Sequence, residues 1–256
     1  IHSPNSRLID GVEWWLTYES KRIIAVSNSA KREIEEHFRL PSGKVDVIPN
    51  AIDASKYNIS VDRESVKRRF GIAPYERIVL FIGRLAPQKG VEYLIKAAPQ
   101  IVRVNPDARI VIVGDGWLKD HLWSLAVQTG CQHKITFLGF LPDNDLVELT
   151  VSSDVLVVPS VYEPFGIVAL EGMAAGVPVV ASNTGGLSEI IEHDRTGFLA
   201  YAENPDSIAW GVNRILSDPG YASWLTQNAK RKIYEMYSWD AVAERTIEVY
   251  RRALEG

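Results

Sequence analysis

Two glutamates lie eight positions apart in the segment Glu163-Pro-Phe-Gly-Ile-Val-Ala-Leu-Glu171. The run 154–159 before this segment is apolar and β-branched, as buried strands are, and the residues that follow it continue as a buried helix would. The segment therefore occupies a strand-to-helix junction. The first backbone N–H groups of such a helix have no intrahelical partner and suit a phosphate. Here they belong to Gly166, Ile167 and Val168.

The two carboxylates would bracket that phosphate. Glu163 comes just before the helix start, whereas Glu171 lies about 7 Å further along the axis, at 1.5 Å per residue. Both could accept hydrogen bonds from sugar hydroxyl groups. The segment thus predicts a site for a sugar joined to phosphate.

A loop with two cations, Gly83-Arg84-Leu85-Ala86-Pro87-Gln88-Lys89-Gly90, follows a strongly apolar predicted strand and precedes an amphipathic helix. It therefore lies at the carboxyl edge of a sheet, where open α/β sheets bind ligands. Arg84 offers a planar fork of donors and Lys89 a mobile point charge, and these suit a diphosphate whose charge must be neutralised. The alternative is that both are solvated loop charges.

Other short motifs do not indicate a cofactor. The glycines of Val113-Gly-Asp-Gly116 lack the spacing of a dinucleotide-binding loop, because Lys119 stands where the third glycine belongs. Asp143-Asn-Asp145 is interpreted as helix capping rather than as a metal site. The five histidines have no ligand spacing, and we expect them at the surface or at helix ends.

The pattern along the chain predicts an α/β fold with a doubly wound, Rossmann-like parallel sheet, because short apolar runs alternate with amphipathic stretches after Leu40. We expect strands at 45–48, 78–82, 109–113, 135–138, 155–158, 177–181 and 198–200. Helices are expected at 91–104, 118–129, 145–151, 165–175 and 187–192, and three more close the chain at 205–216, 221–236 and 240–254. The first forty residues, with a helix at 12–20, a strand at 23–26 and a helix at 29–38, form a βα unit with no earlier sheet to join, so we expect an upstream part to be absent.

Composition narrows the function. A net charge of −4 argues against nucleic acid or an anionic membrane as the partner. The single cysteine, Cys131, fits a reducing, cytoplasmic setting. No apolar run reaches the roughly 18 residues of a membrane span, so we expect no membrane partner.

The motifs in their order resemble the nucleotide-binding half of family 4 glycosyltransferases with the GT-B fold, which include glycogen synthases. The resemblance runs through Val47-Ile-Pro-Asn-Ala-Ile-Asp53, Gly83-Arg-Leu with Lys89-Gly90, Phe137-Leu-Gly-Phe-Leu141, the Glu163 to Glu171 segment, Gly176-Val-Pro-Val-Val-Ala181, Gly185-Gly-Leu-Ser-Glu189 and Thr196-Gly-Phe-Leu199. Glu13-Trp-Trp-Leu-Thr-Tyr-Glu19 is similar to the glycogen synthase type. We divide the chain into 1–40, the tail of an amino-terminal acceptor domain with a linker helix, 41–237, the sugar-nucleotide domain, and 238–256, a C-terminal helix.

The resemblance implies roles for single residues. Arg84 and Lys89 would hold the donor diphosphate and stabilise the departing nucleotide, Glu163 would contact the transferred sugar, and Glu171 the ribose. The remaining donor-binding positions it implies are Gly83, Leu141 beside the base, Phe165, and Gly166, Ile167 and Val168 at the distal phosphate.

The resemblance also implies a reaction. A retaining enzyme of this kind would transfer glucose from ADP-glucose or UDP-glucose to an α-glucan without a metal or other cofactor. Because the amino-terminal domain with its acceptor side is missing, we expect this chain alone to bind nucleotide without transferring sugar.

Several alternatives stay open. A glycoside hydrolase also uses two carboxylates, but it needs neither two cations nor a phosphate site. A sugar-nucleotide epimerase, a transferase of the same family with another sugar or acceptor, and a nucleotide-binding module without activity are the others. The seven tryptophans are expected in packing roles, whereas Tyr162 and Phe165 are candidates for ligand contact.

Overall fold

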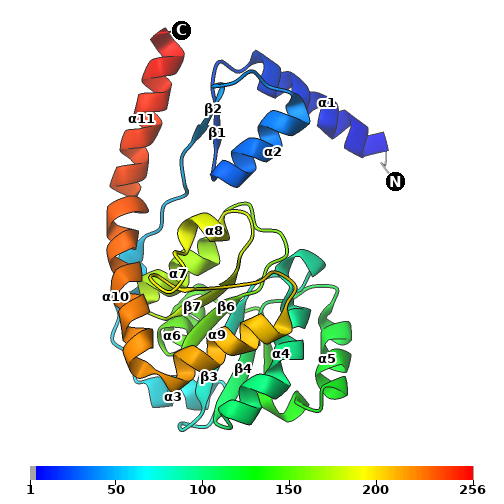
Figure 1. Cartoon of the computed structure of the whole chain (residues 1–256), viewed down its shortest axis with the longest axis vertical. Coiled ribbons are helices and arrows are strands. Elements are labelled where there is room, and N and C mark those ends of the chain that lie inside the picture. Colours follow the sequence, from blue (N-terminus) through cyan, green and yellow to red (C-terminus); the bar gives the residue numbers. More distant parts are fainter. Residues whose placement is uncertain (1–3, 256) are drawn as a thin grey trace.

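Two parallel sheets organise the protein, for which a computed structural model describes the backbone of residues 4–255 (Figure 1). The larger has six strands in the order β5-β4-β3-β6-β7-β8. Their bounds are β3 Arg77–Ile82, β4 Ala108–Val113, β5 Ile135–Gly139, β6 Val155–Val158, β7 Val179–Ser182 and β8 Phe198–Ala200. The strand order reverses direction between β3 and β6, and the carboxyl ends at such a switch point form the ligand crevice of open α/β sheets. The predicted doubly wound parallel sheet is confirmed.

Helices cover both faces of this sheet (Figure 1). One face is covered by α4 Val91–Val104, α5 Lys119–Gln128 and α9 Pro205–Ser217, and the other by α6 Asp143–Val151, α7 Ile167–Ala175 and α8 Leu187–Ile190. Alternate residues of β3 serve the two cores, Val79 and Phe81 in one, Ile78 and Leu80 in the other. Because both faces are buried, the strands are apolar throughout, which is why they were recognisable in the sequence.

The second sheet joins β1 Ile23–Ala25 and β2 Val45–Val47, and with α1 Pro4–Glu19 and α2 Asn28–Phe38 it forms what we call the amino-terminal unit. The assignment of residues 45–48 to the main sheet is wrong, since Val45 pairs with Ile23. Parallel strands require a crossover, and α2 supplies it here. A short apolar run does not reveal which sheet it joins.

The stretch between the two units contains elements that the sequence did not predict. A 3₁₀ turn, η1 Ala54–Tyr57, follows Asp53, which accepts from the Ser55 N–H, and the helix α3 Arg63–Arg69 follows Asp62. Both elements are too short to show a periodicity. The 3₁₀ turns η2 Pro87–Lys89 and η3 Gln132–Lys134 are shorter still.

Two long helices close the chain and run along one side of the molecule (Figure 1). They are α10 Pro219–Met236 and α11 Trp239–Glu255. Helix α10 begins two residues earlier than predicted because Asp218 caps it by accepting from the Tyr221 N–H at 2.9 Å. Helix α11 reaches back to β2, where Arg252 pairs with Asp46 at 3.0 Å. None of the helices in residues 4–255 has the length and apolar character needed to cross a membrane.

Side chains cap the outer edge of β8, the last strand of the main sheet. The Leu199 N–H donates to His193 Nδ1 at 3.0 Å, and the Tyr201 N–H donates to Ser207 Oγ at 3.1 Å. Backbone donors that would face solvent at a sheet edge are thereby satisfied within the chain.

Candidate functional site

Lys89 and Glu163 meet at the carboxyl rim of the sheet. Lys89 Nζ lies 2.6 Å from Glu163 Oε2, and both side chains are largely buried, with exposed fractions of 24% and 13%. Ser160, itself buried, donates its hydroxyl proton to the same oxygen at 3.1 Å. Lys89 follows β3 and Glu163 follows β6, the two strands that flank the switch point. A cation and a carboxylate are thus held together at the crevice.

The backbone on either side of Glu163 is fixed by two other loops. The Val161 N–H donates to the Gln88 carbonyl at 2.9 Å, and the Gly186 N–H donates to the Glu163 carbonyl at 2.9 Å. A Cβ at Gly185 would lie 2.2 Å from that carbonyl oxygen, so only glycine allows this approach. The Glu163 loop is therefore preorganised before any ligand arrives.

Gly83 carries the chain from β3 into the cationic loop. Its N–H donates to the Val113 carbonyl at 3.0 Å, and a Cβ on Gly114 would lie 1.9 Å from its carbonyl oxygen. Gly114, with φ of 126°, thus allows the two strand exits to touch. Of the two interpretations of the Gly114 to Gly116 turn, close backbone approach is met by the neighbouring loop.

Arg84 lies on the same loop as Lys89, but its side chain takes another direction. It is exposed, and its guanidinium carbon lies 5.9 Å from the centre of the Trp117 ring. Within residues 4–255, Arg84 forms no ion pair. The structure therefore places Arg84 beside the crevice without joining it to the Lys89–Glu163 pair.

Helix α7 begins at Ile167, with Gly166 as its N-cap in the left-handed region at φ 113°. Among the described residues, the N–H groups of Ile167 and Val168 have no hydrogen-bond partner, so the anion-suited helix start of the sequence prediction is present. Phe165 is 6% exposed, and its ring lies 6.3 Å from that of Tyr237. The helix prediction from residue 165 started too early, and the Phe165 side chain belongs to the core.

Glu171 lies on α7 and faces η1 rather than Lys89. Burial raises the pKa of Glu171 above its usual range, although a hydrogen bond from the Tyr57 hydroxyl and the charge of Lys56 oppose this. Burial and the Glu171 charge also raise the pKa of Tyr57. Tyr57 was missed because nothing distinguishes a single tyrosine in a linker.

The Leu141 position and the acidic triplet lie close to Glu171 in the chain path, at the start of α6. Leu141 is partly buried and packs on the core beneath α7. The capping interpretation of the triplet is wrong, because Asp143 pairs with Lys56 at 3.2 Å and Asp145 with Arg69 at 3.4 Å. Both carboxylates still favour the helix start electrostatically. In residues 4–255, no three His, Cys, Asp or Glu side chains are grouped to hold a metal ion.

The amino-terminal unit contacts the same loop. Ser27 donates to the Pro164 carbonyl at 2.6 Å, and the Tyr162 hydroxyl donates to Glu33 at 2.7 Å, which raises the pKa of Tyr162. Tyr162, a predicted ligand contact, is thus engaged with α2. Serine and glutamate pairs so distant in sequence leave no local pattern from which these contacts could be found.

Glu189 of α8 completes the contact with α2. Its carboxylate accepts from the Asn28 N–H at 2.9 Å, the Asn28 side chain at 2.8 Å and the Ser29 N–H at 2.9 Å. Burial alone would raise the pKa of Glu189, but these bonds outweigh it and the pKa is lowered. Glu189 therefore satisfies backbone donors at the start of α2.

Known structures share this arrangement. The crystal structure of Anabaena HepE in complex with UDP-glucose aligns with 98% of this chain and 70% of its own, with a TM-score of 0.87 and 26% sequence identity. Sucrose-phosphate synthase of Thermosynechococcus elongatus aligns with 100% of this chain and 64% of its own, with a TM-score of 0.84 and 26% identity. The fold is that of one half of a GT-B glycosyltransferase together with the amino-terminal unit.

Sequence comparison agrees with the fold. An uncharacterized glycosyltransferase of Methanocaldococcus jannaschii is 48% identical over the whole chain, and glycogen synthase of Mycobacterium tuberculosis is 36% identical over 98% of it. The chain spans 66% and 59% of the length of these two relatives. A family model described as Glycosyltransferase Family 4 matches residues 1–56, and one described as Glycosyl transferases group 1 matches residues 62–232. Because the latter covers most of the chain, the protein belongs to the glycosyltransferases of group 1.

Proposed function

We propose that this chain is the donor-binding part of a retaining glucosyltransferase that uses UDP-glucose or ADP-glucose and extends an α-glucan. The observation that carries the proposal is the Lys89–Glu163 pair beside the free N–H groups of Ile167 and Val168, at the switch point of the sheet. A cation, an anion-suited helix start and a sugar-suited carboxylate are what a sugar diphosphate requires. The UDP-glucose complex of the Anabaena protein and the similarity to a glycogen synthase support the choice of donor and acceptor.

The residues divide the work as follows. The distal phosphate accepts hydrogen bonds from the start of α7, while Lys89 and Arg84 neutralise the diphosphate. Glu163 accepts from hydroxyl groups of the glucose, Glu171 from the ribose, and the backbone near Leu141 meets the base. Gly83 lets the cationic loop approach the phosphates closely.

The transfer itself breaks the bond between the sugar C1 and the diphosphate oxygen. The electron pair goes to the diphosphate, where Lys89 and Arg84 stabilise the developing charge. An acceptor hydroxyl forms the new bond to C1 on the same face and loses its proton. Acceptor binding and exclusion of water need a second domain in front of the crevice, upstream of residues 1–40, so this chain alone binds donor without elongating glucan. No metal is needed for these roles.

Calorimetric titration of the chain with UDP, ADP and uridine tests the proposal. UDP or ADP is expected to bind at least about tenfold more tightly than uridine, because the diphosphate supplies the charge-assisted contacts. Incubation of the chain with UDP-glucose and a glucan primer should give no elongated product. Absence of saturable nucleotide binding, or equal affinity for uridine and UDP, would contradict the proposed site.

A sister hypothesis is a transferase of the same family that acts on another sugar or acceptor. The residues around the diphosphate would be identical in that case. Titration with UDP-glucose, ADP-glucose, UDP-galactose and UDP-N-acetylglucosamine separates the two, because the proposed donors should bind more tightly than the others.

A further inference from the structure

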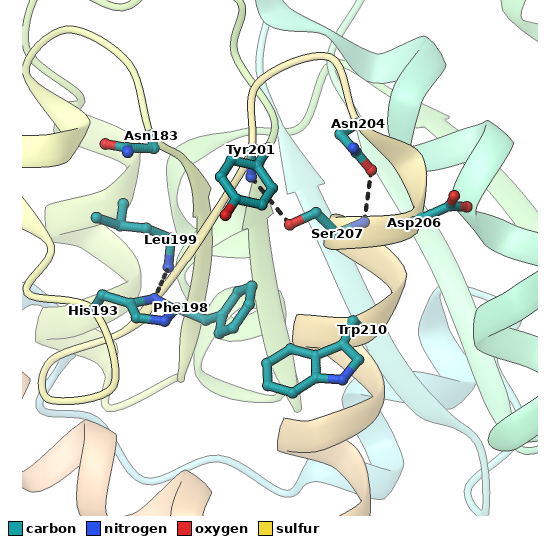
Figure 2. Close-up of a pocket in the computed structure, with 9 residues that line it drawn as sticks. All are labelled: Asn183, His193, Phe198, Leu199, Tyr201, Asn204, Asp206, Ser207 and Trp210. Carbon is teal, nitrogen blue, oxygen red and sulfur yellow. Dashed lines mark hydrogen bonds between the residues drawn. The ribbon is translucent and has the colours of Figure 1, made fainter.

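A cavity of about 620 Å³ lies beside β8, the edge strand of the main sheet, two strands beyond β6. Its walls come from the loop after β7, from β8 and the residue that follows it, and from α9 (Figure 2). This volume is within the range of small-molecule sites. Neither Lys89 nor Glu163 lines the cavity, so it is separate from the proposed donor site.

Two aromatic side chains present surface to this cavity. Trp210 of α9 packs against Phe198 of β8 with ring centres 5.1 Å apart, and yet it is 55% exposed. The guanidinium carbon of Arg214 lies 5.3 Å from the Trp210 ring centre. Tyr201 is 73% exposed. An aromatic ring that is held in place and open to solvent offers rigid contact area at little cost in conformational entropy, which suits stacking with the apolar face of a sugar ring.

The polar groups of the cavity are uncharged. Among the described residues, Asn183 and the Tyr201 hydroxyl have no hydrogen-bond partner, and the Ser207 hydroxyl, which accepts from the Tyr201 N–H, keeps its own proton to donate. The one carboxylate in the lining, Asp206, is bound by Gln100 and points away from the rings (Figure 2). Neither lysine nor arginine lines the cavity. Such a lining matches a ligand rich in hydroxyl groups and without charge, and it is unsuited to phosphate.

We infer that this cavity binds a neutral oligosaccharide, with one sugar ring stacked on Trp210 and its hydroxyl groups bonded to Asn183 and Ser207. The site lies on the same rim as the donor crevice, because Asn183 follows β7 and Tyr201 follows β8. Neighbouring strands are about 4.8 Å apart, so β8 lies about 10 Å from β6, which leads to Glu163. A glycan bound here is held within a few sugar units of the crevice. The inference stands independently of the donor proposal.

Titration of the ¹⁵N-labelled chain with maltoheptaose and with cellohexaose, followed by the tryptophan indole N–H signals, tests the inference. The Trp210 signal, assigned with Trp210→Phe, should shift with at least one oligosaccharide. Trp210→Ala should weaken that binding about tenfold, and Asn183→Ala about threefold. Trp123→Ala is the matched control, because Trp123 is 49% exposed and packs against Phe137 of the opposite edge strand at 5.8 Å. It should leave the affinity unchanged.

Several outcomes would overturn the inference. These are no shift at about 10 mM of either oligosaccharide, an equal effect of Trp123→Ala, and a shift of the Trp210 signal by uridine or adenosine in place of the sugars. If Trp210→Ala fails to fold, Tyr201→Ala and Asn183→Ala decide, since both side chains are exposed. A parallel UDP titration reports on the donor site, so loss of UDP binding with oligosaccharide binding retained would contradict only the proposed function.

Discussion

The hydroxyl of Ser27 donates a hydrogen bond of 2.6 Å to the carbonyl oxygen of Pro164, although the two residues are 137 positions apart. Pro164 directly follows Glu163, and Tyr162, which precedes it, donates to Glu33 of the same helix α2. Both neighbours of the candidate sugar-binding carboxylate are thus tied to the amino-terminal unit. A movement of that unit would displace Glu163 without touching the phosphate-suited helix start.

Removing the Tyr162 hydroxyl tests this connection. Tyr162→Phe keeps the ring and loses the bond to Glu33, so Glu163 should become less well positioned. We expect UDP-glucose binding to weaken about threefold, in line with one hydrogen bond of about 0.7 kcal/mol, and UDP binding to stay unchanged. Calorimetry with both ligands measures the difference. Tyr234→Phe, at an exposed tyrosine of α10, is the control. Equal weakening of both ligands would argue against positioning through Glu163.

Loss of the Glu189 charge should destabilise the contact between α8 and α2. We expect Glu189→Gln to lower the free energy of unfolding by about 1–2 kcal/mol, since three donors lose a charged acceptor. The pKa of Glu189 is lowered, so its contribution is present above its unfolded value of about 4.5 and is lost as the pH falls through the folded pKa. The wild type and the variant should therefore converge in acid.

Urea denaturation at about pH 7 and about pH 3.5 measures this, with Glu35→Gln, a more exposed pair partner of Lys31 on the same helix, as the control. A difference that persists unchanged in acid would show that the Glu189 charge is not its source.

Replacing Lys89 should separate diphosphate binding from nucleoside binding. In Lys89→Ala the diphosphate loses one cation, and UDP affinity should fall at least about tenfold, while uridine affinity stays constant. Lys96→Ala, at an exposed lysine paired with Glu92 within α4, serves as the control. Titration of each variant with UDP and uridine gives the two ratios. Equal affinity of wild type and Lys89→Ala for UDP would exclude Lys89 from the site.

Glu171 should make the folded state less stable as the pH rises. Its pKa is raised by burial above the usual 4.5, so the folded chain binds more protons than the unfolded chain between these two values. The free energy of unfolding then decreases with rising pH through that window. Glu171→Gln should remove this decrease and be more stable than the wild type at about pH 7, while binding ADP and adenosine more weakly.

Urea denaturation of both proteins between about pH 4 and about pH 8 follows the effect. The hypothesis of a buried, destabilised carboxylate fails if the variant is the less stable protein at neutral pH.

The sequence predicted the main sheet well because burial on both faces leaves unbroken apolar strands such as 78–82 and 109–113. It also predicted that the loops bearing Lys89 and Glu163 lie at one rim, since parallel strands end on the same side. It did not place residues 45–48 in the smaller sheet, because pairing partners are a property of the whole chain. The directions of Arg84 and Glu171 were equally inaccessible, since these depend on Trp117 and Tyr57, which no spacing rule connects to them.

The edge of β8 has a consequence for how the molecule behaves among its own copies. Sheet edges with free backbone donors recruit strands from neighbouring molecules, the first step of fibril growth. His193 and Ser207 already occupy the outward N–H groups of Leu199 and Tyr201. A recruited strand would have to displace both before it gained a single bond, so the fold carries its own protection against polymerisation along this flank.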